Sequence, residues 1–385
     1  MKKILSVALV IFFAITTGAQ TSSQKAGISI NKNFSKAAAL ETILKRYTKD
    51  GLPGASLAVY SEQEGWWAGV AGYSNVETKK EMNIHHLQYL QSVAKTYMAT
   101  AILKLYEDGK LKLDDPATKY LPAKFSKYLA ALNKVTVRML LNHSSGLPEY
   151  STHPAFVSFV MLHPTLVFNA EEGLKYLSGE PMLFEPGTKH SYTNTNYLLL
   201  SVIADKLTGD HAAYIDKNIF HKLGLTNTFY RSNPGYLKYT NLVDSYWDVL
   251  NTGRPANITS LQKANVATLK GDDGIVCTTT DAIQFLKGLE EGRLLKDSTL
   301  ALMKQWVNDD EGKPIYGLGL VHYEAGGLTG YGHSGGGIGA GCILLYVPEK
   351  KIYIFMATNV GTLFGGSLAK KADDLKNEVL ATLLF

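Results

Sequence analysis

A serine followed three residues later by a lysine is the first pair in this chain that could do chemistry. On a helix the two side chains lie one turn apart on the same face, within hydrogen-bonding reach. A lysine kept from water among cationic or hydrogen-bonding groups can lose its proton and act as a base toward the serine. The helix N-terminus favours the negative charge that develops there. The pattern occurs at Ser22, Ser29, Ser92, Ser260 and Ser367, so at least four matches arise by chance.

Sequence context favours the pair Ser92 and Lys95. Residues 92–107 have the apolar spacing of a buried helix, and Lys95 falls in its first turn. The other four serines lie in a polar segment near the N-terminus, after a loop-like stretch, or at the start of a helix whose lysines are expected to be solvated. Taken alone, the motif is equally compatible with an N-cap serine followed by an exposed lysine.

A rival nucleophile motif, G-x-S-x-G, is formed by residues 332–336 around Ser334. In that motif the serine sits on a turn between a strand and a helix, and its histidine follows it in the chain. Here the last histidine is His333, which precedes Ser334, and residues 342–347 have the pattern of a strand. The sequence therefore argues against Ser334 as a nucleophile.

A tyrosine two residues before an asparagine occurs at Tyr73, Tyr192 and Tyr239. Tyr192 differs from the others because it follows the turn-forming residues 185–188 and precedes a predicted helix over 195–207. Its side chain and that of Asn194 are therefore expected on a fixed loop.

These motifs stand in the order Ser92-Val93-Ala94-Lys95, Tyr192-Thr193-Asn194 and His333-Ser334-Gly335. With them the chain resembles the serine hydrolases of the class C β-lactamase and D-alanyl-D-alanine carboxypeptidase family. Further similar segments are residues 72–80, 113–122, 135–148, 186–188 and 274–285, so that the resemblance covers roughly residues 36–385.

The resemblance implies roles for individual residues. Ser92 is the acylated nucleophile, Lys95 its base partner, and Tyr192 the group that passes protons to the leaving group. Asn194, His333, Ser334 and Gly335 contact the substrate, and the backbone N–H groups of Ser92 and Gly336 form the oxyanion hole. No metal and no cofactor are implied.

His333 departs from the pattern of the related β-lactamases, which usually carry lysine at this position. A histidine is largely neutral near neutral pH and anchors a substrate carboxylate less well than a lysine does. We therefore expect an exported serine hydrolase acting on D-alanyl peptides of the cell wall or on small esters and amides. Alternatives are a class C-like β-lactamase, with β-lactams as substrates, and a catalytically weak penicillin-binding or sensor protein.

The pattern of predicted elements suggests how these residues are brought together. Strands are expected at 55–61 and 66–73 and again at 316–323, 340–347 and 352–358, with helices at 36–47 and 366–384. Between them lies a region rich in helical patterns, roughly 113–305. We predict an α+β architecture of the β-lactamase/transpeptidase type: an antiparallel sheet flanked by helices, with an inserted all-helical lobe.

The N-terminus reads as an export signal, with Lys2 and Lys3 before an apolar run and a small-residue cleavage site near Ala19. Residues 20–35 follow as a polar leader, and an uncleaved anchor is the rival interpretation. Without the two lysines the formal charge falls from +5 to +3, and the remaining lysines are scattered among acids. We expect a periplasmic or secreted protein with no membrane span after cleavage and no nucleic-acid partner. The two cysteines, Cys277 and Cys342, could pair or remain free.

Overall fold

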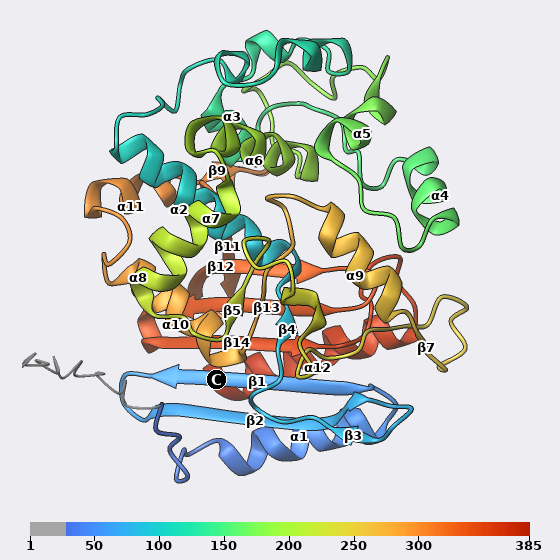
Figure 1. Cartoon of the computed structure of the whole chain (residues 1–385). Coiled ribbons are helices and arrows are strands. Elements are labelled where there is room, and N and C mark those ends of the chain that lie inside the picture. The colour runs from blue at the N-terminus through green and yellow to red at the C-terminus, as the bar shows by residue number, and fades with distance from the viewer. Residues whose placement is uncertain (1–27) are drawn as a thin grey trace, which may run out of the picture.

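Strands from both ends of the chain form one large sheet. The computed structural model describes residues 28–385, and within them nine strands pair antiparallel in the order β3-β2-β1-β14-β13-β12-β11-β10-β9. In Figure 1 the N-terminal strands, in blue, lie directly beside the C-terminal strands, in red. The strands are β1 (Gly54–Ser61), β2 (Gly65–Asn75), β3 (Lys80–Glu81), β9 (Val307–Asn308), β10 (Pro314–Tyr316), β11 (Val321–Ala325), β12 (Leu328–Gly336), β13 (Gly341–Val347) and β14 (Ile352–Thr358).

Both faces of this sheet are covered, because side chains alternate along each strand. In β14, Ile352, Ile354 and Met356 belong to the apolar cluster that includes residues of α1 (Ala37–Lys49) and α12 (Ser367–Leu384). Tyr353 and Phe355 face the opposite way, into the larger cluster with α2 (Ala94–Glu107) and α10 (Thr279–Glu290). The sheet is thus the middle layer between two helical layers.

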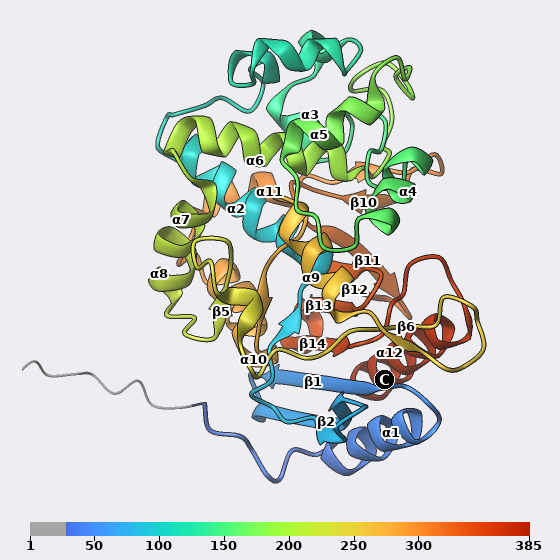
Figure 2. The same ribbon diagram turned by 45° about the vertical axis from the view of Figure 1, so that its right-hand side comes forward.

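The remaining helices form a lobe above the sheet (Figures 1 and 2). They are α3 (Val137–Leu141), α4 (Pro154–Leu162), α5 (Ala170–Leu174), α6 (Asn194–Thr208), α7 (His211–Ile215), α8 (His221–Leu223), α9 (Thr259–Thr268) and α11 (Asp297–Met303). The predicted architecture is confirmed, but the insertion is not all-helical. It also carries the two-stranded sheet β6-β7 (Tyr246–Trp247, Ala256–Asn257) and two strands, β5 (Thr228–Phe229) and β8 (Val276–Cys277), which form a small sheet with β4 (Gln88–Tyr89) from the segment before Ser92.

The single strand predicted at 316–323 is wrong, because the chain reverses between β10 and β11, where Tyr316 pairs with Val321 and the Gly317 N–H donates to the Leu320 carbonyl at 2.8 Å. In this turn Gly319 has φ +84°, and a Cβ there would lie 2.3 Å from the Cβ of Ala99 on α2. The Thr96 hydroxyl of α2 donates to the Gly319 carbonyl at 2.8 Å. The turn thus packs on the helix that follows Ser92. Other elements were not predicted, among them glycine-rich β12, α4 and α9, the last two in stretches where loops were expected.

Packing reaches back to the start of the described residues. Ile30 pairs with Trp66 of β2, and buried Phe34 stacks on Trp67 at 6.1 Å between ring centroids. The leader's last residues therefore belong to the folded body. The expected signal at residues 1–19 lies outside the described residues. In residues 28–385, no helix combines the length and apolar character needed to cross a bilayer.

Candidate active site

Ser92 lies in a single 3₁₀ turn, η1 (Gln91–Val93), that leads directly into α2. The residue before it, Gln91, has φ +47°, a left-handed conformation that non-glycine residues seldom adopt. Strand β12 runs close to this turn: a Cβ on Gly335 would lie 2.5 Å from the Leu90 carbonyl oxygen and 2.8 Å from the Gln91 Cβ. Only glycine fits there, and this contact fixes Ser92 against the sheet.

Lys95 is fully buried one turn after Ser92, with 0% of its surface exposed. Its ammonium nitrogen donates to three oxygens: Ser92 Oγ at 3.0 Å, Asn194 Oδ1 at 2.7 Å and the backbone carbonyl of Asp272 at 3.0 Å. The three partners come from three distant parts of the chain. Lys95 is therefore not the exposed lysine of a simple helix start.

Tyr192 lies just before α6, and its ring stands over the Lys95 ammonium at 5.0 Å from the ring centroid. Burial raises the pKa of Tyr192 above its usual value, although the nearby Lys95 lowers it. The phenol is therefore neutral near pH 7. The residue is 39% exposed, so one side of the ring faces solvent while the hydroxyl faces the Ser92–Lys95 pair.

His143 supports the loop that carries Tyr192. It is buried, its ring packs on that of Tyr192 at 4.4 Å between centroids, and the Thr193 backbone N–H donates to its Nδ1 at 3.3 Å. Burial and the nearby Lys95 lower the pKa of His143 well below its usual value, so the ring is neutral.

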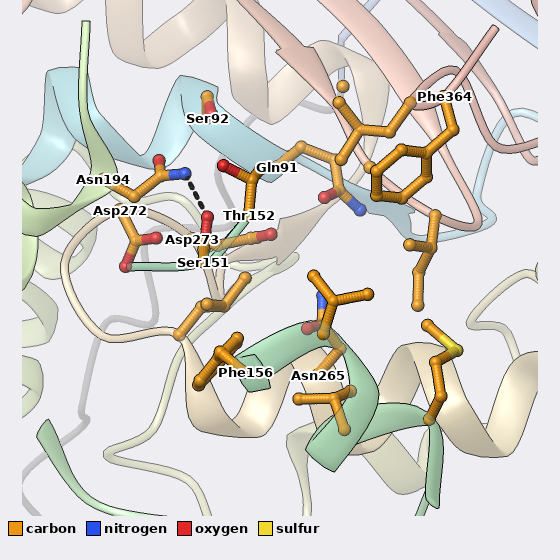
Figure 3. A pocket seen from close by; sticks show the side chains of 18 residues that line it. Gln91, Ser92, Ser151, Thr152, Phe156, Asn194, Asn265, Asp272, Asp273 and Phe364 are labelled. Atoms are coloured by element: carbon orange, nitrogen blue, oxygen red, sulfur yellow. Dashed lines mark hydrogen bonds between the residues drawn. The ribbon is translucent and has the colours of Figure 1, made fainter. Parts of the chain in front are cut away.

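Asn194, the first residue of α6, has both ends of its amide hydrogen-bonded within the protein. Its Oδ1 accepts from Lys95, and its Nδ2 donates to the Ser151 hydroxyl at 2.8 Å, as Figure 3 shows. The Nδ2 amide carries two N–H groups, so the expected contact with substrate can use the second one while the Ser151 bond is kept.

His333 and Ser334 of β12 point to opposite faces of the sheet, as neighbouring residues of a strand must. His333 is buried beside Tyr192, at 6.1 Å between ring centroids, and pairs with the Tyr316 hydroxyl at 2.9 Å. Burial and Lys95 lower its pKa to about 3, so it carries no charge.

The side chain of Ser334 lies on the other face of the sheet from that of His333, and its contact with substrate stays a prediction. Ser334 pairs with Ile343, which lies in the apolar cluster with α12, and it lines a surface hollow with Lys376 of α12. The one-residue step from His333 turns it to the far side of the sheet.

Gly336 has its backbone N–H available. The N–H of the next residue, Gly337, donates to the Ala340 carbonyl at 3.0 Å, so the N–H of Gly336 points toward the other edge of β12. There β11 pairs with β12 no further than Gly332. This N–H and that of Ser92 border the cavity described next, which both residues line.

A cavity of about 70 Å³, open to solvent, lies beside Ser92 (Figure 3). One side is polar, with Gln91, Ser92, Ser151, Asn194 and Asp272 among its residues. The other is apolar and is built by Phe156, Val157, Val160 and Met161 of α4 together with Leu269, Ile338, Leu363 and Phe364. Tyr192 and His333 are not among the lining residues, so the cavity lies on one side of the nucleophile and the tyrosine on another.

The sequence analysis missed two buried acids, Asp272 and Asp273, that line this cavity. Burial raises the pKa of Asp272 to about 7 and that of Asp273 to about 6, while Lys95 lowers both. The only signal in the sequence is a pair of acids between Gly271 and Gly274, which is also typical of an exposed turn.

Elsewhere in residues 28–385, Asp205, Asp210 and His211 bring potential metal-ligand atoms within 4.8 Å of one another. Asp205 already accepts from His211, and Asp210 caps α7. Both cysteines are buried and free.

Comparisons with known proteins agree with this arrangement. A family model described as Beta-lactamase matches residues 37–376. Penicillin-binding protein 4* of Bacillus subtilis is 26% identical over 74% of this chain and 64% of its own length. A putative D-alanyl-D-alanine carboxypeptidase of Escherichia coli is 26% identical over 56% of this chain and 50% of its own length. The chain thus spans half to two thirds of these relatives.

Among solved structures, the D-amino acid amidase of Ochrobactrum anthropi in complex with L-phenylalanine amide has a TM-score of 0.76. It is 25% identical, and the match covers 90% of this chain and 97% of the amidase. A D-stereospecific amidohydrolase from Streptomyces has a TM-score of 0.75 at 25% identity, over 88% of this chain and 97% of its own.

Proposed function

Because the chain belongs to the Beta-lactamase family of serine hydrolases, we propose that it hydrolyses amide or ester bonds through an acyl-enzyme on Ser92. The observation that carries the proposal is the contact of the fully buried Lys95 with Ser92 Oγ, at 3.0 Å. Two further acceptors hold the buried amine of Lys95 on the Ser92 hydroxyl. The start of a helix does not need this arrangement, whereas the activation of a serine does.

The acylation step follows from the contacts. Ser92 Oγ attacks the substrate carbonyl carbon while its proton passes to Lys95 Nζ, which lies 3.0 Å away and acts as the base of this step. The negative charge on the carbonyl oxygen is stabilised by the N–H groups of Ser92 and Gly336. Tyr192 donates a proton to the leaving amine or alcohol and is reprotonated from Lys95. Water then attacks the ester carbonyl while its proton passes to Lys95 by way of Tyr192, and Lys95 gives that proton to Ser92 Oγ as it leaves.

We propose D-alanyl peptides, D-aminoacyl amides and small esters as the substrate class. The similarity to carboxypeptidase and D-amino acid amidase chains supports this choice. The neutral His333 disfavours a β-lactamase, because it supplies no cation for the carboxylate of a β-lactam. We further propose that the protein is exported, on the basis of its N-terminal sequence.

The test is labelling with a fluorophosphonate probe, followed by mass mapping of the modified peptide. We expect a single adduct on Ser92 that is lost in Ser92→Ala. An adduct elsewhere, or none with any acylating probe, would refute the mechanism. Turnover of a D-alanyl-D-alanine peptide, a D-amino acid amide, a p-nitrophenyl ester and nitrocefin, each with the Ser92→Ala control, then ranks the substrates. Fast nitrocefin turnover would favour the β-lactamase alternative.

A further inference from the structure

The cavity beside Ser92 holds acidic groups that the mechanism above does not use. Asp272 is 1% exposed and lines the cavity, and its Oδ1 has no hydrogen-bond partner in the described part of the chain. A buried carboxylate oxygen without a donor is costly, and such atoms are rare unless a ligand completes them. In Figure 3 its side chain lies beside Asn194 and Ser151, at the polar side of the cavity.

Asp273 adds a second carboxylate to the same wall. It is 4% exposed, and its Oδ1 accepts one hydrogen bond, from the backbone N–H of Gly274 at 2.6 Å. Asp272 and Asp273 can thus accept more hydrogen bonds than the described residues donate to them.

A third acid nearby, Glu149, by contrast has both carboxylate oxygens hydrogen-bonded within the protein. Its Oε1 accepts from the Ser151 N–H at 2.7 Å and its Oε2 from the Asn194 N–H at 2.5 Å. Glu149 therefore holds the loop before α6, and the acceptors left for a ligand are those of Asp272 and Asp273.

Three acidic groups gather beside the cavity, those of Glu149, Asp272 and Asp273, and they interact with one another and with Lys95 and Arg231. Arg231 directs its guanidinium to the backbone carbonyls of residues 266, 267 and 269 and makes no side-chain ion pair in the described structure. Asp272 and Asp273 are therefore not paired with this guanidinium.

We propose that Asp272 and Asp273 bind an ammonium group of the substrate, so that preferred substrates carry a free amine on the acyl side of the scissile bond next to an apolar side chain. This inference rests on the proposed acyl-enzyme mechanism. Lys95 Nζ bridges Ser92 Oγ and the Asp272 backbone carbonyl, and Ser92, Asp272 and Asp273 line the same cavity. The apolar wall of α4 would receive the side chain. An N-terminal amino acid amide has this combination of groups.

The test compares two anilides that differ only in the amine. D-Phenylalanine p-nitroanilide carries an α-ammonium, and 3-phenylpropionic acid p-nitroanilide has hydrogen in its place. We expect the wild type to favour the first by about tenfold to a hundredfold in kcat/KM, as a charge-assisted hydrogen bond implies. In Asp272→Asn and in Asp273→Asn the ratio of the two kcat/KM values should fall by about tenfold, because the ratio cancels any effect that is common to both anilides.

Asp281→Asn is the matched control. Asp281 is also buried, but it accepts from the Asn227 N–H and the Thr228 hydroxyl, and it is not among the residues lining the cavity. The ratio should stay at its wild-type value, and thermal unfolding would establish that each variant is folded.

The outcomes separate the two proposals. A wild-type ratio near one, or a ratio unchanged in the Asp272→Asn, Asp273→Asn double variant, overturns the ammonium site but leaves the hydrolase mechanism standing. An equal loss on both anilides also overturns it, because the acids would then act on Lys95 and not on the amine. Absence of both turnover and fluorophosphonate labelling of Ser92 refutes the mechanism itself.

Discussion

Replacing Lys95 by methionine tests the buried amine directly. The change keeps the length of the side chain and removes the three hydrogen bonds to Ser92, Asn194 and Asp272. The Asn194 Oδ1 and the Asp272 carbonyl then lose their donor inside the protein, at about 1–3 kcal/mol each. Methionine also removes the cost of burying the amine, which offsets part of this loss. We therefore expect the unfolding free energy to fall by about 2–4 kcal/mol in total.

The chemical effect should be larger than the effect on stability. General-base assistance contributes about 10²–10⁴ in rate, so acylation should slow by about a thousandfold in Lys95→Met. The pre-steady-state burst of p-nitrophenol from p-nitrophenyl acetate measures acylation, and urea denaturation measures stability. Lys95→Arg adds a second case: it keeps the charge and donors but cannot release a proton at neutral pH, and should be folded and inactive.

Lys104→Met supplies the control. Lys104 lies on the same helix, is partly buried and donates to the Leu294 carbonyl at 3.3 Å, away from Ser92. It should keep its burst rate. If folded Lys95→Met acylated within tenfold of the wild type, Lys95 would not be the base, and the role assigned to its contact with Ser92 would be wrong.

Three further predictions concern neighbouring groups. Tyr192→Phe should lower kcat for anilides by about 10²-fold with little change in KM, because only proton delivery to the leaving amine is lost; an equal rise in KM would indicate substrate binding instead. Burial raises the pKa of Asp272 from 3.8 to about 7, so the protonated carboxyl stabilises the fold below pH 4 and this stabilisation is lost as the pH rises to 7. From pH 4 to pH 8, the unfolding free energy of Asp272→Asn, measured with urea, should therefore rise by up to about 4 kcal/mol relative to that of the wild type. Equal changes in the two proteins would show that the Asp272 carboxyl does not have this raised pKa. Gly335→Ala places a Cβ 2.5 Å from the Leu90 carbonyl and should cost about 1–3 kcal/mol, measured by thermal unfolding; an unchanged midpoint would show that β12 can move away from η1.

Much of the fold could be predicted from local patterns. The patterns of residues 55–61 and 352–358 predict strands, and the structure pairs them as the neighbours β1 and β14. Glycines concealed β12, because they carry no side chain to alternate. The reversal between β10 and β11 was not predicted, because residues 316–323 read as one strand.

For the candidate site, the sequence by itself determined which residues could carry acyl transfer: the pair Ser92 and Lys95, and Tyr192 before its helix. That chemistry depends on one-turn helix spacing and on a turn, which are local properties. Only the tertiary structure decided that Lys95 is buried between Asn194 and Asp272, that Ser334 faces away, and that two acids line the cavity. The surroundings of Lys95 arise where segments far apart in the chain pack together, since Asn194 lies 99 residues and Asp272 177 residues from Lys95, and no local pattern encodes such contacts.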